Sequence, residues 1–200
     1  MSLSKTTLDN LYIIKQQSVA RIANSLGCSQ SRVNYWLRKY KIQKRSISEA
    51  TYTLRNPKGD PFTKVAIRTD KQNFLFGLGL GLYWGEGTKK NRNSVRLGNS
   101  DPDLIRVFIK FLESCYQIDR KRLRFGLQLF SDSDVKREEM FWRKSLKISG
   151  EQFYKTTVTV SGRVGTYKEK TKHGVLTVYF NNTKLRNLLV EEIENLRKLR

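Results

Sequence analysis

The first 48 residues carry apolar side chains at the three- and four-residue spacing of helices. Ser18 and Ser29 are placed to cap two of these helices, and Gly27 supplies the turn between them. Small Ala23, Gly27 and apolar Val33 have the spacing of a helix-turn-helix, with an ordinary helical hairpin as the alternative. We expect a further helix over residues 6–17 to support the pair. The apolar residues assigned to these helices are Leu8, Leu11, Ile13, Ile14, Ile22, Leu26, Val33, Trp36 and Leu37.

After residue 73, segments whose apolar residues have helical spacing are interspersed with segments in which apolar and polar residues alternate as in strands. Asp101 followed by Pro102 is a strong helix start, Asp132 or Ser133 begins another helix, and Thr183 caps a last one. This order predicts an α+β domain. The expected helices cover residues 73–86, 101–116, 132–146 and 183–196, and the expected strands cover 88–92, 94–99, 123–130, 153–160 and 175–180, the first two paired as a hairpin.

The pattern weakens between these two regions. Residues 56–61 read Asn-Pro-Lys-Gly-Asp-Pro, which is typical of a turn or loop. We therefore expect a helix-turn-helix domain over residues 1–48, a linker over 49–72 and a larger domain over 73–200.

The charge balance indicates a polyanionic partner. The 200 residues hold 39 Lys and Arg against 18 Asp and Glu, a net charge of +21 that is spread along the chain. Nucleic acid is the expected partner, and a charge-driven RNA, ribosome or heparin-type binder is one alternative. Cys28 and Cys115 lie too far apart in the sequence to form a metal motif or a disulfide framework, which favours a reducing, intracellular setting. No secretion signal or membrane span is expected.

A glycine-rich stretch over residues 73–90 carries the most specific signal. Gly77, Gly81 and Gly85 recur every four residues and share one face of a helix. Each costs roughly 0.5–1 kcal/mol relative to Ala, so close approach of a second backbone is expected to compensate. Glu86 falls at the negative end of the helix dipole, where an acid is unfavourable unless a cation binds. The alternative is a buried core helix with an incidental Glu.

Residues 81–87, GLYWGEG, resemble the motif of the LAGLIDADG homing endonucleases. The resemblance implies a saddle-shaped sheet with the order αββαβ(α)ββα, and a divalent metal held by Glu86 and the Gly85 carbonyl. Trp84 stands where the family has its first acid, and Glu86 replaces the usual Asp. One copy of the motif implies a homodimer through Gly77, Gly81 and Gly85. Mg²⁺ or Mn²⁺ is the expected cofactor, with no small-molecule cofactor.

The resemblance also implies roles for residues elsewhere in the domain. Asn99 and Lys184 are the expected partners of Glu86 in positioning the attacking water. The sheet is expected to face double-stranded DNA, with a basic loop over residues 162–174 beside it. The expected DNA-facing residues are Lys89, Lys90, Arg92, Arg96, Arg122, Arg124, Gln128, Lys155 and Thr157.

The second helix of the helix-turn-helix offers a further DNA surface. Its exposed side chains suit base edges, since Asn and Gln pair well with adenine and Arg with guanine. The expected residues are Gln30, Ser31, Asn34, Tyr35 and Arg38. The sequence thus predicts a metal-dependent, site-specific DNA endonuclease. A DNA-binding transcription regulator that keeps this fold without catalysis is the main alternative.

Other nuclease classes fit less well. His173 is the only histidine, which excludes HNH nucleases and histidine-rich metal sites, and we expect it to be a loop residue. A three-acid transposase site is disfavoured because the available aspartates are better explained as helix starts. The glycines lack the ending of a phosphate-binding P-loop.

Overall fold

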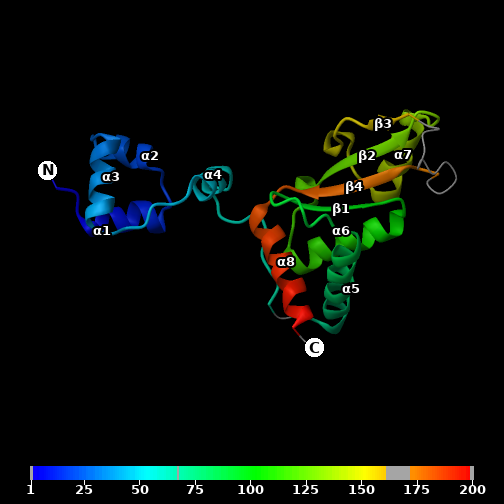
Figure 1. Ribbon diagram of the computed structural model, residues 1–200, viewed down its shortest axis with the longest axis horizontal. Coiled ribbons are helices and arrows are strands. Elements are labelled where there is room, and N and C mark those ends of the chain that lie inside the picture. The colour runs from blue at the N-terminus through cyan, green and yellow to red at the C-terminus, as the bar shows by residue number, and fades with distance from the viewer. Residues whose placement is uncertain (1, 67, 161–171, 199–200) are drawn as a thin grey trace. The chain divides into compact units, whose positions relative to one another are not determined.

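The computed structural model describes residues 2–66, 68–160 and 172–198 (Figure 1). The chain divides into two compact units, Met1–Asp60 and Pro61–Arg200. Each unit has its own cluster of buried hydrophobic side chains. The junction falls within residues 49–72, where we expected a linker.

The first unit contains the expected pair of helices, α2 (Val19–Ser25) and α3 (Gln30–Lys39). The Ser18 hydroxyl accepts a hydrogen bond from the Arg21 amide at 3.1 Å, and the Ser29 hydroxyl accepts one from the Arg32 amide at 3.2 Å. Gly27 has a φ of +60°, a conformation that favours glycine at this turn. The capping and turn predictions for α2 and α3 are confirmed.

The preceding helix differs from the prediction. It begins as α1 (Lys5–Leu8) and continues as a π-helix, η1 (Asp9–Ile14). Ile13 and Ile14 are 54% and 76% exposed, so their assignment to the core was wrong. Tyr12 is buried instead, because it lies one turn after Leu8 on the inward face. Trp36 of α3 is only partly buried.

An unpredicted helix, α4 (Ile47–Arg55), lies within the first unit. Ser46 and Glu49 form a capping box: the Ser46 hydroxyl accepts from the Glu49 amide, and the Glu49 carboxylate accepts from the Ser46 amide at 2.7 Å. The Ser-x-x-Glu spacing is a recognised helix start, and it was the signal that sequence reasoning passed over.

The second unit is an α+β domain, which confirms the predicted fold class. Its four-stranded sheet has the order β1-β4-β2-β3, antiparallel except for the parallel pair of β2 and β3. The strands are β1 (Val95–Asn99), β2 (Arg124–Phe130), β3 (Thr157–Thr159) and β4 (Val175–Phe180). The helices are α5 (Asp70–Glu86), α6 (Pro102–Tyr116), α7 (Val135–Leu146) and α8 (Thr183–Arg197), with 3-10 turns η2 (Arg120–Arg122) and η3 (Gly150–Gln152).

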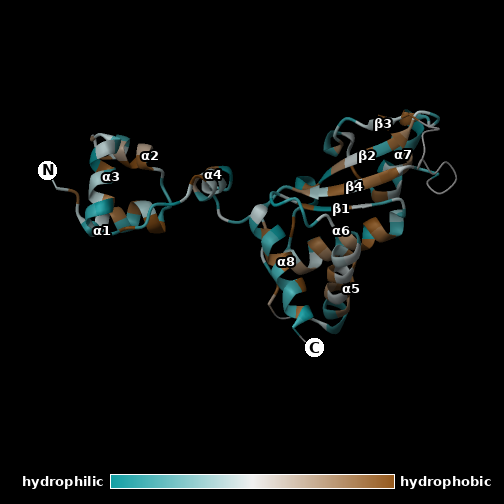
Figure 2. Ribbon diagram, in the orientation of Figure 1, coloured by the Kyte–Doolittle hydropathy of each residue, from teal (hydrophilic) through white to brown (hydrophobic). Residues whose placement is uncertain are grey.

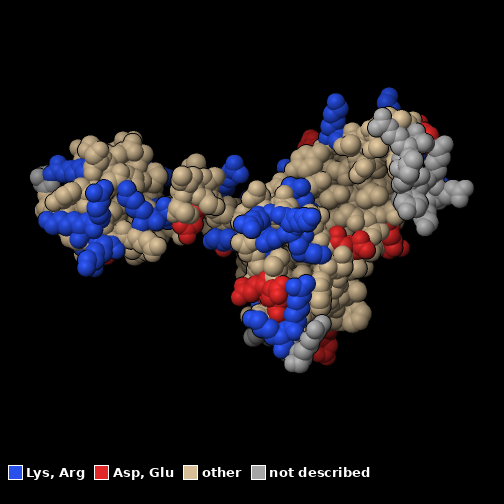
Figure 3. All heavy atoms as spheres, viewed as in Figure 1, with Lys and Arg blue, Asp and Glu red and all other residues tan. Residues whose placement is uncertain are grey.

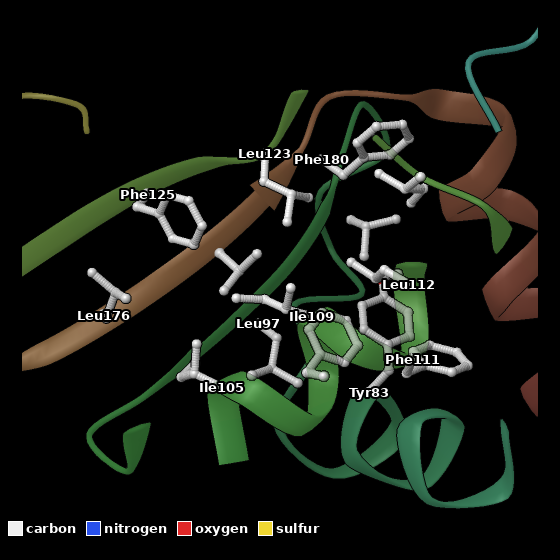
Figure 4. Packing of buried hydrophobic residues seen from close by; sticks show 14 of the residues in the cluster. Tyr83, Leu97, Ile105, Ile109, Phe111, Leu112, Leu123, Phe125, Leu176 and Phe180 are labelled. Carbon is white, nitrogen blue, oxygen red and sulfur yellow. The ribbon is translucent and has the colours of Figure 1, made fainter. Parts of the chain in front are cut away.

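The core of this domain lies on one side of the sheet. Helices α5, α6 and α8 lie on that side (Figure 1). Hydrophobic residues lie along the strands and along α6 (Figure 2), and every second residue of β4 is buried. Figure 4 shows Tyr83 of α5, Leu97 of β1 and Ile109 of α6 within the same cluster. Because period-two alternation sends successive side chains to opposite faces, the other sheet face keeps its own set of side chains.

Several predicted boundaries need correction. Residues 88–92 are not a hairpin strand, because the Asn91 side-chain oxygen accepts hydrogen bonds from the Asn93 and Ser94 amides and turns the chain. The strand expected over 153–160 is limited to Thr157–Thr159. The N-caps of α7 and α8 are Asp134 and Asn182, one residue or two from the expected positions.

Candidate nucleic-acid interface and helix-end site

The sheet face opposite the core presents its side chains in cross-strand rows. Arg96 of β1 and Arg124 of β2 both pair with Tyr179 of β4, which gives the row Arg96–Tyr179–Arg124. The guanidinium carbon of Arg96 lies 5.2 Å from the Tyr179 ring centroid. Tyr154 contacts the same ring edge-on, with a centroid distance of 5.4 Å. Cations and aromatic rings together suit the phosphates and bases of nucleic acid.

The next rows are smaller and uncharged. Gly98, Thr177 and Gly126 form the second row, and Val175, Gln128 and Thr157 meet in the third. The Tyr179 ring lies close to Gly126: a Cβ added at Gly126 would be 3.1 Å from the ring. Among the residues of this open face that the structure describes, none carries a carboxylate. We call this surface, from Arg96 to Thr157, the open sheet face.

The structure separates the expected DNA-facing residues into two groups. Arg96, Arg124, Gln128 and Thr157 lie on the open sheet face. The remainder lie in connecting segments and are half-buried or exposed: Lys89, Lys90, Arg92, Arg122 and Lys155. Of the basic loop expected over 162–174, residues 162–171 fall outside the described part of the chain.

Sequence reasoning predicted the strand over residues 175–180, but it did not include that strand's outward side chains in the DNA-facing set. Thr177 and Tyr179 of β4 lie between the two arginine-bearing strands, and Tyr154 lies beside them. The alternation of β4 gave the signal, since Leu176, Val178 and Phe180 are buried and their neighbours must point away. The order of strands in the sheet, which brings β4 between β1 and β2, was not readable from the pattern.

Helix α5 is apolar on nearly all sides, yet one face is uncovered in the single chain. Gly77, Gly81 and Gly85 are exposed, and a Cβ added at each would meet nothing within 4 Å. Phe74 and Leu78, on the same face, are 73% and 40% exposed. We call this the glycine face of α5. Packing against the described residues of the chain therefore does not explain the three glycines.

Gly79 has the opposite environment. A Cβ at this position would lie 2.1 Å from Cγ of Phe111, so α6 approaches α5 closely here. Tyr83 and Leu80 are buried on the same side, and the Tyr83 ring stacks on Phe108. Burial of the Tyr83 hydroxyl raises its pKa, and the nearby Arg186 opposes this.

Glu86 is the last residue of α5 and is exposed. Gly87 pairs with Leu97, which places Glu86 next to the edge strand β1. At the same end of α5, the Lys89 ammonium donates a 2.6 Å hydrogen bond to the Trp84 carbonyl. Arg186 of α8 donates to the carbonyls of Lys89 and Asn91 and fixes this connecting segment.

The donor set at this helix end fits a hard divalent cation in kind. A carboxylate and backbone carbonyls are the oxygen ligands that Mg²⁺ prefers, with water and phosphate oxygens completing the shell. One chain supplies too few ligands by itself, because its described residues contain no group of three or more His, Cys, Asp or Glu side chains that could hold a metal ion. The carboxylate of a second Glu86 and the phosphates of a nucleic acid would have to supply the rest.

The two residues expected to assist Glu86 lie apart. Asn99 ends β1 opposite Leu176, and its side-chain oxygen accepts a hydrogen bond from the Asp101 amide at 2.9 Å. Lys184 begins α8 just after Phe180, which pairs with Val95 at the other end of β1. Because strands rise about 3.3 Å per residue, the length of β1 separates the two positions.

The recognition surface expected on α3 is available. Gln30, Ser31, Tyr35 and Arg38 are exposed and Asn34 is half-buried. Tyr35 contacts Trp36 edge-on, and the Lys39 ammonium lies 4.6 Å from the Trp36 ring centroid. Figure 3 shows Lys and Arg side chains distributed over the helices of this unit.

His173 has a more specific environment than a loop residue. Its Nδ1 lies 2.6 Å from the carboxylate of Glu138, which is fully buried and also accepts from Arg137. Desolvation raises the pKa of Glu138, but the hydrogen bonds from His173 and Arg137 outweigh it and the net pKa is lowered. The His173 ring also stacks on Phe141. This cluster joins α7 to the start of β4.

Comparison of the chain with protein-family models, curated proteins and solved structures finds no match. None of the helices that the structure describes combines the length and hydrophobicity needed to cross a bilayer.

Proposed function

We propose that the chain is a site-specific DNA endonuclease that binds duplex DNA as a homodimer and hydrolyses phosphodiester bonds with Mg²⁺ or Mn²⁺ at Glu86. The observation that carries this proposal is the open sheet face. It presents the Arg96–Tyr179–Arg124 row and lacks carboxylates at its described positions, and the exposed Glu86 lies next to its edge strand β1.

The dimensions of the open sheet face suit the major groove. Neighbouring strands lie about 4.8 Å apart, so β1, β4 and β2 together span about 10 Å, within a groove of about 12 Å. Side chains on one face repeat about every 6.7 Å along a strand, close to two base-pair steps of about 3.4 Å. In a LAGLIDADG-like saddle, Arg96 would contact guanine and Gln128 adenine. The helix-turn-helix would lengthen the site through α3.

The glycine face of α5 supports the homodimer. Three exposed glycines allow another backbone to approach closely, and Phe74 and Leu78 would lose water on contact. Full burial of such side chains stabilises by about 1.5–3 kcal/mol each. A two-fold axis along this face would bring both Glu86 residues to the same end of the helix pair. When bound there, Mg²⁺ would activate water and stabilise the leaving oxygen.

Gly81→Leu tests the dimer. It is expected to convert the dimer to a monomer in analytical ultracentrifugation, because a side chain on the glycine face keeps the helices apart. Lys110→Leu, which adds the same side chain at an exposed position of a different helix, α6, is the control. If the Gly81→Leu protein is as dimeric as the control, the dimer does not use this face.

A DNA-binding regulator without catalysis is the second candidate. Two observations favour it: the Lys89 ammonium already lies on the α5 end, and Asn99 and Lys184 lie at opposite ends of β1. In this reading the open sheet face and α3 bind DNA in the same way, and no bond is cut.

Cleavage of a randomised plasmid library, with binding measured in the same samples, separates the two candidates. The endonuclease proposal expects Mg²⁺- or Mn²⁺-dependent double-strand breaks at a preferred site, abolished in Glu86→Gln while binding persists. Sequence-selective binding with no cleavage in either metal would favour the regulator. Salt-sensitive binding without sequence preference would overturn both, because phosphate contacts alone would then account for the affinity.

The role of the open sheet face is tested by Tyr179→Ala and Arg96→Ala, with Lys110→Ala on α6 as a matched charge control. Lys110 is exposed on a helix that covers the other side of the sheet. Tyr179→Ala and Arg96→Ala should both lose the preference for the DNA site selected from the library. Lys110→Ala should cause only a slight change in the salt-dependent affinity for DNA. Equal effects of Arg96→Ala and Lys110→Ala would show that this face does not read DNA.

A further inference from the structure

The C-terminus of α5 already holds a cation of the chain itself. The last carbonyls of a helix have no partner within the helix and carry partial negative charge. At the α5 end, the Gly87 amide donates to the Tyr83 carbonyl at 2.9 Å, and the Lys89 ammonium donates to the Trp84 carbonyl at 2.6 Å. Glu86, the last residue of α5, adds a full negative charge at this end of the helix.

Lys89 is presented to the helix end by a well-anchored segment. The Thr88 amide donates to the Arg96 carbonyl of β1 at 2.9 Å. From α8, Arg186 donates to the carbonyls of Lys89 and, at 3.0 Å, Asn91. The segment that carries Lys89 is therefore tied to β1 and to α8, and this anchoring directs the ammonium at the helix end. Lys89 as a whole residue is half-buried.

We infer that Lys89 is an internal counter-ion that competes with a divalent cation for the α5 end beside Glu86. This inference rests on the proposed function, in which Glu86 binds the metal. The ammonium is held at the Trp84 carbonyl, one residue before the Gly85 carbonyl expected to hold the cation, and its charge repels any cation bound to the Glu86 carboxylate. Lys89 thereby neutralises the helix end without metal and lowers its affinity for metal.

Two consequences follow from the electrostatics. Without metal, loss of the Lys89 charge should destabilise α5, because the negative end of the helix dipole loses the ammonium bound to the Trp84 carbonyl. With metal, the same loss should tighten binding, by about tenfold at low ionic strength for a unit charge removed at this range. Metal should then restore the stability that the substitution removed.

The test is Mn²⁺ binding to the full chain, followed by the electron paramagnetic resonance signal of free Mn²⁺. Lys89→Met is compared with wild type, with Lys90→Met as the matched control, because Lys90 is exposed and adjacent. Lys89→Arg keeps the charge, and Glu86→Gln removes the carboxylate. Thermal unfolding of each variant is recorded with and without Mn²⁺.

The expected result is tighter Mn²⁺ binding and a lower metal-free Tm in Lys89→Met alone, with Lys89→Arg close to wild type. Binding by Lys89→Met but not by wild type would also support the inference, and would identify the natural protein as the metal-free regulator. Equal Mn²⁺ affinity in wild type, Lys89→Met and Lys90→Met would overturn the inference and leave the endonuclease proposal standing. No Mn²⁺ binding in any variant would overturn the inference and the metal chemistry together, while duplex binding would still test the DNA interface.

Discussion

The two sides of α5 make opposite predictions for the same substitution, glycine to alanine. At Gly79 the added Cβ would lie 2.1 Å from Cγ and 2.5 Å from Cβ of Phe111, so α5 and α6 must separate. At Gly81 it would meet nothing within 4 Å. Both changes raise the intrinsic helix propensity equally, so their difference isolates the packing between the two helices.

The magnitudes can be worked out from these distances. Helix propensity favours each alanine by about 0.5–1 kcal/mol. Overpacking typically costs about 1–3 kcal/mol, and Gly79→Ala should fall at the upper end because the Phe111 ring is fully buried and cannot swing into solvent. We therefore expect Gly79→Ala to be destabilised by about 2 kcal/mol net and Gly81→Ala to be stabilised by about 0.5–1 kcal/mol.

The assay is urea unfolding of both variants at low protein concentration, where the single chain is measured. In the second unit, Trp84 of α5 and Trp142 of α7 give a fluorescence signal for unfolding. Gly77→Ala serves as a second exposed control. Equal stability of Gly79→Ala and Gly81→Ala would refute the described contact between α5 and α6. If the glycine face forms a dimer, Gly81→Ala should lose its gain in stability when the protein concentration is raised.

Three further predictions concern other parts of the molecule. Glu138→Gln should lower the free energy of unfolding at neutral pH and should make that free energy less dependent on pH in the acid range. Because folding lowers the pKa of Glu138, the carboxylate stabilises the fold above its ordinary pKa of 4.5, and this stabilisation is lost as the pH falls through the folded pKa. Urea unfolding at several pH values measures the effect. Arg186→Met should speed amide hydrogen exchange at Thr88 and Ser94, because the segment loses two carbonyl contacts; unchanged exchange there would contradict the anchoring role. Ser46→Ala should cost α4 about 1 kcal/mol and fray that helix alone, seen as lost helical circular dichroism without a shift in the main unfolding transition.

The sequence by itself determined the local elements. Ser18, Ser29 and Asp101 cap the helices where their side chains predicted, since a capping hydrogen bond depends only on residues two or three positions away. The alternation of β2 and β4 likewise fixed which of their side chains are buried. The glycine spacing predicted that α5 has a face without side chains, and the end of the helix at Glu86 was also correct.

The tertiary structure decided which residues meet. The placement of β4 between β1 and β2 puts Tyr179 between Arg96 and Arg124, and no local pattern specifies the order of strands. Sequence spacing likewise could not distinguish Gly79, which contacts Phe111, from Gly81, which contacts nothing. These relations depend on contacts between residues distant in the chain, whose energies belong to the packed domain as a whole and not to any one segment.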